Sequence, residues 1–286
     1  MQDITTGILG GTAASEAPRL AKALGSPKRY AVFGGIYNNW LSLEATLADA
    51  RKRGCERVYC LGDLGGFGPH PERVFPILRR ERVIVMQGNY DHSIGHDLPD
   101  CGCGYTDPRD NHYAQLSYEY TRRKTPVEER PWLSALPPRL TERWGGSRVL
   151  MAHGSPRQVN EFLWESTSPD AFLHRLCNQF ECELLLVTHT GIPWQRRLGD
   201  GRLVVNVGAI GRPANDGSRD VWYAVITEHR GELEVELVPV AYDWRTLAAE
   251  MRQEQICPEF IETVETGWWT TCLEILPAKE RARGRY

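Results

Sequence analysis

Residues 58–63 read Val-Tyr-Cys-Leu-Gly-Asp, and residues 83–91 read Val-Ile-Val-Met-Gln-Gly-Asn-Tyr-Asp. Each stretch begins with a short apolar run and continues into a glycine followed by a polar residue, which is typical of a buried strand that ends in a tight turn. The run Tyr30-Ala-Val-Phe33, followed by Gly34-Gly35, repeats this pattern upstream. Residues 39–53 and 71–80 have the character of helices that connect these strands. The alternation predicts an α/β fold with βαβ units on a parallel or mixed sheet.

Further strands and helices are predicted along the rest of the chain. Apolar runs predict strands at 148–152, 183–187, 203–207, 221–227 and 233–239, and helical patterns predict helices at 112–124, 127–136, 170–180, 244–254 and 258–266. Residues 91–110, rich in glycine, aspartate and proline, predict a long irregular loop. We expect an N-terminal leader at 1–28, one domain at 29–242, and C-terminal helices and a tail at 243–286 packed on that domain.

The composition is that of an ordinary globular protein. The 286 residues carry a net charge of −3, with 41% hydrophobic and 25% charged residues, which excludes wholesale disorder. A nucleic-acid partner is not expected because the charges form no basic stripe. No apolar run reaches the roughly 18 residues of a membrane span, and the first 25 residues lack a signal-peptide pattern. With only eight cysteines, the chain is expected to be cytoplasmic.

Four predicted strands are followed by residues that can bind a metal ion. These residues are Asp63, Asn89, His153 and His189. Any one of them alone is explained as a turn residue or a buried histidine, but open α/β sheets build their sites at the carboxyl ends of strands. One carboxylate, one amide oxygen and two imidazoles suit a divalent cation such as Mn, Fe or Zn.

The order of these residues resembles the calcineurin-like metallophosphoesterases. That family's blocks read D-x-H, G-D, G-N-H-[DE], H and G-H-x-H. This chain has Gly62-Asp63, then Gly88-Asn-Tyr-Asp91, then His153-Gly154, then Thr188-His-Thr-Gly191. The resemblance covers about residues 30–227. It implies an αββα sandwich, in which two sheets are flanked by helices and metals lie at the strand ends.

The departures from the family fall on one of its two metal sites. The D-x-H block is Gly35-Ile-Tyr37 here, the histidine of G-N-H is Tyr90, and the last histidine of G-H-x-H is Gly191. By the resemblance, the first metal keeps only Asp63. The second metal keeps its whole ligand set, which is Asp63, Asn89, His153 and His189. We therefore expect one strongly bound divalent metal ion.

The resemblance also suggests catalytic residues and ways to rebuild the first site. Tyr90 stands where the family's histidine assists the leaving group, with Asp91 expected to orient it, although Tyr90 could equally be a packed aromatic. A phenol can donate a proton but is a poor base at neutral pH. Tyr37 could bind iron as a phenolate and so rebuild the first site. Ligands could also come from the following loop, from His92, His96, Asp97, Cys101, Cys103 or His112.

Three further residues are candidates for binding an anionic substrate. Arg157 and Arg212 follow predicted strand ends, and a guanidinium group suits phosphate bidentately. Asn39 matches an asparagine of the family. As alternatives, the arginines could face solvent and Asn39 could cap the helix that begins beside it.

These observations favour a metal-dependent hydrolase that acts on a small phosphate mono- or diester. One alternative is a catalytically inactive relative that binds a phosphorylated ligand or a protein partner. Another is an altered metal site with different chemistry, such as redox work at iron. The intact ligand set favours the first and third interpretations, and the loss of the family's histidine at Tyr90 and of most of the first metal site favours the second. A homo-oligomer is possible, since Trp268-Trp269 either covers the core or forms a subunit contact.

Overall fold

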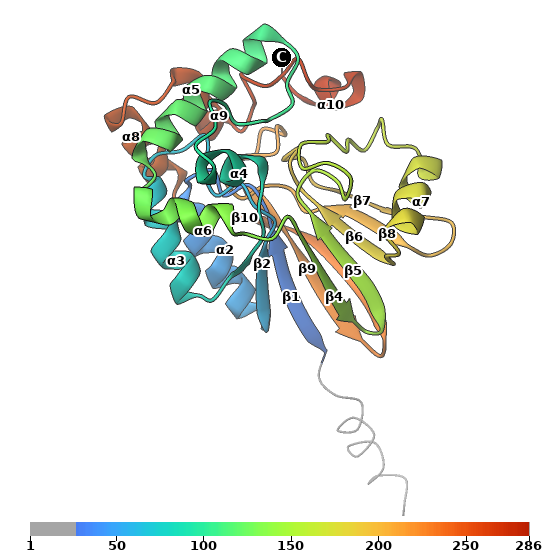
Figure 1. Ribbon diagram of the computed structural model, residues 1–286. Coiled ribbons are helices and arrows are strands. Elements are labelled where there is room, and N and C mark those ends of the chain that lie inside the picture. Colours follow the sequence, from blue (N-terminus) through green and yellow to red (C-terminus); the bar gives the residue numbers. More distant parts are fainter. Residues whose placement is uncertain (1–26, 286) are drawn as a thin grey trace, which may run out of the picture.

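A computed structural model describes residues 27–285, and it contains two five-stranded mixed sheets packed face to face (Figure 1). The first sheet has the order β10-β9-β1-β2-β3, and the second has the order β4-β5-β6-β8-β7. The strands of the first sheet are β1 (Lys28–Phe33), β2 (Arg57–Cys60), β3 (Ile84–Val85), β9 (Val221–His229) and β10 (Glu232–Val240). Those of the second are β4 (Arg139–Trp144), β5 (Ser147–Ala152), β6 (Leu184–Val187), β7 (Trp194–Arg197) and β8 (Leu203–Asn206).

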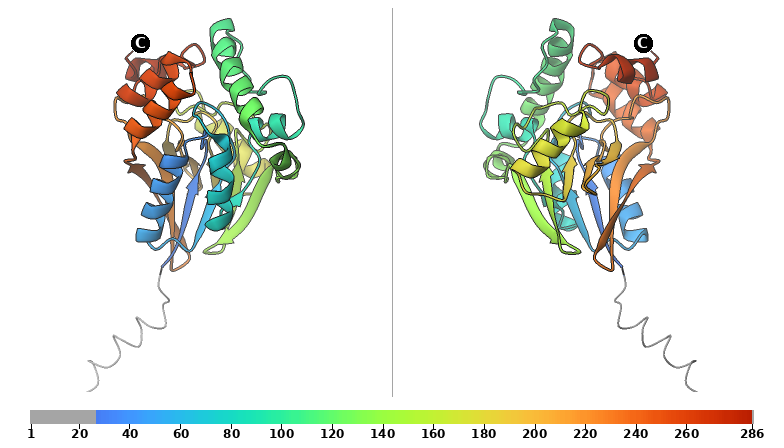
Figure 2. Two further views of the ribbon diagram at one scale, coloured as in Figure 1. Left: turned by 90° about the vertical axis from the view of Figure 1, so that its left-hand side faces the viewer. Right: turned by 90° about the vertical axis from the view of Figure 1, so that its right-hand side faces the viewer.

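Helices cover the outer face of each sheet and one end of the sandwich (Figures 1 and 2). The helices are α2 (Trp40–Lys52), α3 (Val74–Arg80), α4 (Asn89–Gly95), α5 (Pro108–Lys124), α6 (Arg130–Ser134), α7 (Asp170–Gln179), α8 (Trp244–Gln253), α9 (Pro258–Thr266) and α10 (Ala278–Arg283), with 3-10 turns η1 (Pro71–Arg73) and η2 (Val127–Glu129). Figure 2 places α5 and the C-terminal helices at the end of the sandwich opposite the start of β1. The predicted αββα sandwich is therefore confirmed.

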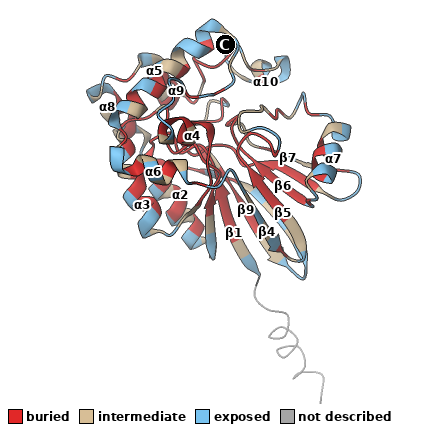
Figure 3. Cartoon of the chain, viewed as in Figure 1, coloured by how far each residue is buried: buried red, intermediate tan, exposed pale blue. Residues whose placement is uncertain are grey.

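The alternation of side chains along each strand builds three apolar layers. In β1, Tyr30 and Val32 face the second sheet, while Ala31 and Phe33 face the helices of the first sheet. The central strands are buried on both faces, as Figure 3 shows by their colour, because each lies between a sheet and a helical layer. In β6, for example, Leu185 packs toward α7 rather than toward the first sheet.

Several predicted elements need correction. The edge strands β4 and β7 and the helix α10 were not predicted. The irregular loop expected at 91–110 is interrupted, since α4 continues to Gly95 and α5 already begins at Pro108. The apolar run at the start of 83–91 forms only the two-residue strand β3.

The two ends of the chain differ in what the structure describes. Apart from its last two residues, the predicted leader at 1–28 lies outside the described residues, and Lys28 already belongs to β1. At the other end, α8 and α9 share an apolar cluster with Tyr120 of α5, and α8 also contacts α2. The domain division at residue 242 stays a prediction. Within residues 27–285, no helix has the length and apolar character that crossing a membrane requires.

Candidate metal centre

Three of the predicted metal ligands converge between the two sheets, at the carboxyl ends of their strands. Asp63 follows β2, His153 follows β5 and His189 follows β6, and all three side chains are buried. One ligand atom from each lies within 4.8 Å of the others. His153 Nε2 is 3.2 Å from Asp63 Oδ2 and 3.1 Å from His189 Nδ1. A carboxylate and two imidazoles gathered in this way form a candidate site for a divalent transition metal.

Asn89, whose turn packs against Asp63, stays a candidate for the fourth ligand. It is the first residue of α4, and its Nδ2 donates to the carbonyl oxygen of Cys101 at 2.9 Å and to Cys103 Sγ at 3.4 Å. These bonds fix the amide, while Asn89 Oδ1 is buried with no hydrogen-bond partner among the described residues. A buried oxygen without a partner is destabilising, and a cation would satisfy it. The residues present therefore fit a bound metal ion.

Two glycines allow the turns that carry Asp63 and Asn89 to touch. Gly62 has φ +88°, and a Cβ there would lie 2.1 Å from the backbone nitrogen of Gly88. A Cβ at Gly88 would lie 2.3 Å from Asp63 Oδ1. The same Asp63 oxygen accepts the backbone N–H of Tyr90 at 3.0 Å. The glycines are required because the two turns pack backbone against backbone.

Asp91 does not orient Tyr90, so that prediction is wrong. Its carboxylate accepts the backbone N–H groups of Asp63 and Gly88, each at 2.8 Å, and of Leu64 at 3.0 Å. Burial, together with the nearby negative charge of Asp63, raises the pKa of Asp91 to about 6 against the opposing effect of these N–H donors. Asp91 therefore ties the two turns together, and both of its oxygens are used by the backbone.

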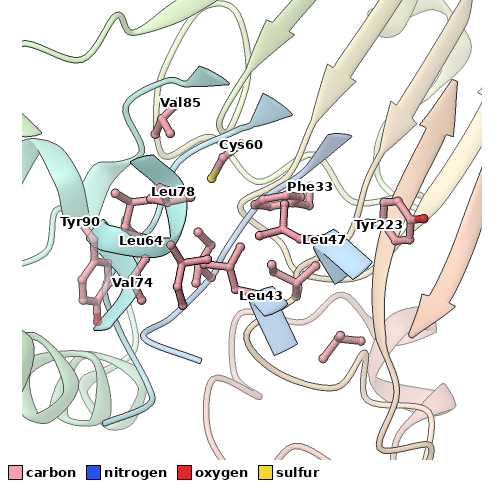
Figure 4. Packing of buried hydrophobic residues seen from close by; sticks show 14 of the residues in the cluster. Phe33, Leu43, Leu47, Cys60, Leu64, Val74, Leu78, Val85, Tyr90 and Tyr223 are labelled. Carbon is pink, nitrogen blue, oxygen red and sulfur yellow. The ribbon is translucent and has the colours of Figure 1, made fainter. Parts of the chain in front are cut away.

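Tyr90 packs as an aromatic residue of the core. Figure 4 shows its ring beside Leu64 and Val74 in the apolar cluster that the first sheet shares with its helices. Its hydroxyl contacts α5, where it donates to Ser117 Oγ at 3.1 Å and to the carbonyl oxygen of Ala114 at 3.4 Å. Burial raises the pKa of this phenol. The structure shows the packed aromatic of the alternative interpretation, and assistance to a leaving group stays a prediction.

The three ionisable ligands differ in their protonation. Burial and the nearby His153 lower the pKa of His189 to about 3, so this imidazole is neutral. Burial alone would lower the pKa of His153, but the adjacent Asp63 outweighs it and raises that pKa. Burial would likewise raise the pKa of Asp63, but His153 outweighs it and lowers that pKa. The two opposite pKa shifts thus favour an ion pair between His153 and Asp63, and a binding cation would compete with it.

A cavity of about 40 Å³ lies beside Asp63 and His189. Its walls are mainly aromatic, and Arg212 is the one arginine that lines it within the part of the chain the structure describes. The aromatic side chains are Tyr37, Phe67, Tyr90, Tyr105, Tyr113 and Phe260. Of the predicted substrate-binding residues, Tyr37 and Arg212 are therefore placed beside the metal centre.

Asn39 and Arg157 are placed elsewhere, so their predicted contact with an anion is wrong. Asn39 caps α2, with its Oδ1 accepting the N–H of Ser42 at 3.0 Å and its Nδ2 donating to the carbonyl oxygen of Gly211 at 3.2 Å. The helix-cap alternative is confirmed for this residue. Arg157 pairs with Glu161 and lies over the Phe172 ring at the surface.

The loop residues that could have rebuilt the first metal site make other contacts. The His92 and His96 rings contact each other at a tilt, with centroids 4.4 Å apart, and Asp97 pairs with Arg122 and Arg130. Cys101 and Cys103 form a disulfide, and the His112 ring lies against Tyr113. Within residues 27–285, the cluster of Asp63, His153 and His189 is the only group of three or more His, Cys, Asp or Glu residues placed to hold an ion.

The sequence did not indicate most of the aromatic residues of the cavity, nor Cys272 and Trp269. Cys272 lines the cavity, and the Trp269 ring stacks on Arg212 with 3.6 Å between the guanidinium carbon and the ring centre. Both lie in the segment after α9, about 80 residues beyond His189 and outside every block of the motif. Trp268-Trp269 stands out in the sequence as an aromatic pair, but no local pattern indicates that it reaches the strand ends.

The chain is similar to known proteins over most of its length. Residues 36–231 match the model of the calcineurin-like phosphoesterase superfamily domain. An uncharacterised protein of Methanocaldococcus jannaschii is 26% identical over 228 residues, covering 74% of this chain and 87% of that protein. A hypothetical protein of Pyrococcus horikoshii superposes with a TM-score of 0.71 at 24% identity, covering 85% of this chain and 99% of that one. A metallophosphoesterase of Sphaerobacter thermophilus gives 0.65 at 24% identity, with coverage of 85% and 100%. These two solved structures share the fold.

Proposed function

Because the chain belongs to the calcineurin-like phosphoesterase superfamily, we propose that it hydrolyses a small phosphate ester with one divalent metal ion. The ion, which we take to be Mn, Fe or Zn, would be held by Asp63, Asn89, His153 and His189. The observation that carries this proposal is the convergence of three ligand atoms within 4.8 Å, together with an unpartnered Asn89 oxygen in the turn that packs against Asp63. The adjoining cavity supports it, since a substrate there would lie next to Asp63 and His189.

The chain's own residues prepare this site for a metal ion and a substrate. His153 Nδ1 donates to the carbonyl oxygen of Leu61 at 2.7 Å, which fixes the tautomer and turns Nε2 toward Asp63. His189 is neutral and needs no deprotonation to bind. Aromatic side chains beside Asp63 and His189 provide apolar surface next to the reacting group. A bound divalent cation supplies Lewis-acid polarisation of a phosphoryl oxygen and a water molecule of lowered pKa.

A second candidate function is binding of a phosphorylated ligand without turnover. The observation that favours it is the Tyr90 hydroxyl, which bonds to α5 where the family has a histidine that assists the leaving group. A site that holds a metal ion and an anion but lacks a proton donor would retain the ligand unchanged.

Metal analysis combined with turnover assays separates the two functions. Purified protein would be loaded with Mn²⁺, Fe²⁺ or Zn²⁺ and assayed on aryl phosphate mono- and diesters, together with Asp63→Asn and His189→Ala. We expect one equivalent of metal in the wild type, and turnover that falls by about 100-fold or more in both variants, beyond the loss typical of outer-shell changes. Arg157→Gln is the matched control and should retain both properties.

Three outcomes would count against the hydrolase. Turnover that persists in Asp63→Asn and His189→Ala would place the reaction elsewhere. Stoichiometric metal with no turnover of any ester would support the binding function instead. Wild-type protein that takes up no metal would exclude the proposed centre altogether.

A further inference from the structure

Arg212 is a buried cation without a carboxylate partner among the described residues. It is 5% exposed, and its Nε is buried with no hydrogen-bond partner in that part of the chain. The ionisable groups that act on it most strongly are two phenols and one thiol, those of Tyr37, Tyr105 and Cys272. Burying a guanidinium group without a counter-ion costs several kcal/mol. This cost suggests that Arg212 serves to bind an anion.

Aromatic rings hold the guanidinium group in place without using its N–H donors. The guanidinium carbon lies 3.6 Å from the centre of the Trp269 ring and 5.0 Å from that of Phe67. Trp269 is itself fixed, since its Nε1 donates to the carbonyl oxygen of Pro213 at 2.7 Å. Stacking engages the face of the guanidinium group and leaves the donors at its edge for a ligand, apart from one that bonds to the Cys272 side chain. Arg212 is therefore preorganised for an anion.

Arg212 lies next to the turn that carries a metal ligand. It lines the same cavity as Asp63 and His189. A Cβ at Gly191, two residues after His189, would be 3.8 Å from Arg212 Nε. A side chain at position 191 would therefore extend toward the space beside Arg212. An anion bound by Arg212 in this cavity would lie next to the metal centre.

Tyr37 occupies the space next to position 35. Gly35 has φ +51°, and a Cβ there would lie 2.6 Å from Tyr37 Cζ and 2.9 Å from the Cβ of Ala209. The ring of Tyr37 thus fills the volume that a side chain at position 35 would need. Arg212 lies over this ring, with 5.9 Å between the guanidinium carbon and the ring centre. A protein carboxylate for a second metal ion has no room at position 35.

We propose that Arg212 binds the phosphoryl group of the substrate and supplies the positive charge that a second metal ion would give, which selects phosphate monoesters. This inference rests on the proposed function. A guanidinium group binds two oxygens bidentately, which leaves a third non-bridging oxygen for the metal centre. A monoester has three such oxygens and a diester has two. The net charge of the site also matches this substrate. A divalent ion, the Asp63 carboxylate and the Arg212 guanidinium group together carry a charge of +2, which balances the charge of a monoester dianion.

Binding of inorganic phosphate to the metal-loaded protein tests this assignment directly. Titration calorimetry would compare the wild type with Arg212→Met and Arg212→Lys, with Arg157→Gln as the matched surface control. We expect the phosphate affinity to fall by about 10- to 100-fold in Arg212→Met, as for other lost charge-assisted bonds, and by less in Arg212→Lys. All variants should still bind one metal equivalent. Methyl phosphate should displace phosphate at least about tenfold better than dimethyl phosphate, the equivalent of one lost charged bond.

The outcomes separate this inference from the hydrolase proposal. Phosphate affinity that is unchanged in Arg212→Met, or equal competition by the two methyl esters, would overturn the inference even if the wild type turns over esters. Phosphate binding that depends on Arg212 in a protein without turnover would uphold it while the hydrolase fails. If Arg212→Met loses the stacking on Trp269 and fails to fold, Arg212→Lys decides. A phosphate affinity of Arg212→Lys equal to that of the wild type would rule out bidentate binding by Arg212.

Discussion

Asp63 and Asp91 are both buried, and the partners of each carboxylate decide its role. Asp63 Oδ2 faces His153 Nε2, so a cation can replace the proton between them. Asp91 accepts three backbone N–H groups, so both of its oxygens are bonded to the backbone. The sequence places both residues directly after strands, where either would pass as a ligand. Only the direction of each side chain separates the metal ligand from the structural residue.

Replacing Asp91 with asparagine should destabilise the protein strongly. The amide group of Asp91→Asn can accept hydrogen bonds at one end only, which leaves one or two buried N–H groups unsatisfied. At about 1–3 kcal/mol for each, we expect the free energy of unfolding to fall by about 3 kcal/mol. Urea denaturation measures this loss. The exposed control Asp97→Asn should change stability by less than about 1 kcal/mol, and an equally small effect of Asp91→Asn would contradict the structural role.

Metal binding should release a proton from His153. Because Asp63 raises the pKa of His153, this imidazole keeps its proton to a higher pH than a free histidine, and the ion must displace it. Metal affinity should therefore rise with pH, by up to about tenfold per unit, and level off above the raised pKa. His189, with a pKa of about 3, adds nothing to this dependence near neutrality.

Calorimetry in buffers of different ionisation enthalpy would count the protons released from His153. His174→Asn is the control, because His174 pairs with Asp200 away from the centre and its loss should leave the proton count unchanged. A metal affinity that stays constant between about pH 6 and 8, across the range where histidines titrate, would show that His153 carries no proton to displace.

At the scale of elements, the start of α2 shows how a residue next to the site can be purely structural. Asn39 uses both ends of its amide within the fold, on Ser42 and Gly211. We expect Asn39→Ala to lower the free energy of unfolding by about 1 kcal/mol or more, and Asn39→Ser to lower it less because serine also caps helices. The KM for a phosphate ester should not change in either variant. A raised KM with unchanged stability would restore Asn39 as a substrate ligand.

The loop between α4 and α5 should control the metal affinity through Asn89. The carbonyl oxygen of Cys101 and the sulfur of Cys103 hold Asn89 Nδ2, which keeps the opposite oxygen free for the ion. We expect the double variant Cys101→Ser, Cys103→Ser to bind metal about tenfold more weakly, as when other outer-shell partners are lost. Cys55→Ser is the control. Equal affinity in the double variant would mean that the loop does not position Asn89.

The sequence could predict the strands that are buried on both faces, and also the edge strand β10, whose apolar residues alternate with polar ones. The apolar run of β6 and the run before Asp63 indicate strands because no solvent-facing side chain interrupts them. The edge strands β4 and β7 could not be recognised, since one face of each is polar and Trp194–Arg197 contains two arginines. The short helix α4 was expected as loop, because Gly88-Asn-Tyr-Asp91 has the composition of a turn.

The candidate site was predictable only where local sequence fixes the side chain. Asp63, His153 and His189 each follow a predicted strand, and the turns bring them together. Arg157 also follows a predicted strand, but its side chain pairs with Glu161 and does not line the site. Trp269 was not predictable as a neighbour of the cavity, since its place depends on how the C-terminal segment packs on the loops that follow β5 and β6.

At the scale of the whole molecule, the ligands come from both sheets. Asp63 and Asn89 follow strands of the first sheet, and His153 and His189 follow strands of the second. The apolar cluster between the sheets joins them along their length, and the metal centre joins them at the carboxyl ends. A bound ion would therefore link the two halves of the sandwich. Unfolding separates these halves and dismantles the centre.

This arrangement predicts that metal raises the melting temperature. An ion that binds only the folded state adds about 2.7 kcal/mol at a free concentration 100 times its Kd. At about 2–4 °C per kcal/mol for a domain of this size, Tm should rise by roughly 5–10 °C and fall again with a chelator. Scanning calorimetry of wild type, His189→Ala and Arg157→Gln measures the shift. It should vanish in His189→Ala and persist in Arg157→Gln, because only the first variant removes a link between the sheets. An equal shift in all three proteins would mean that the metal binds elsewhere on the chain.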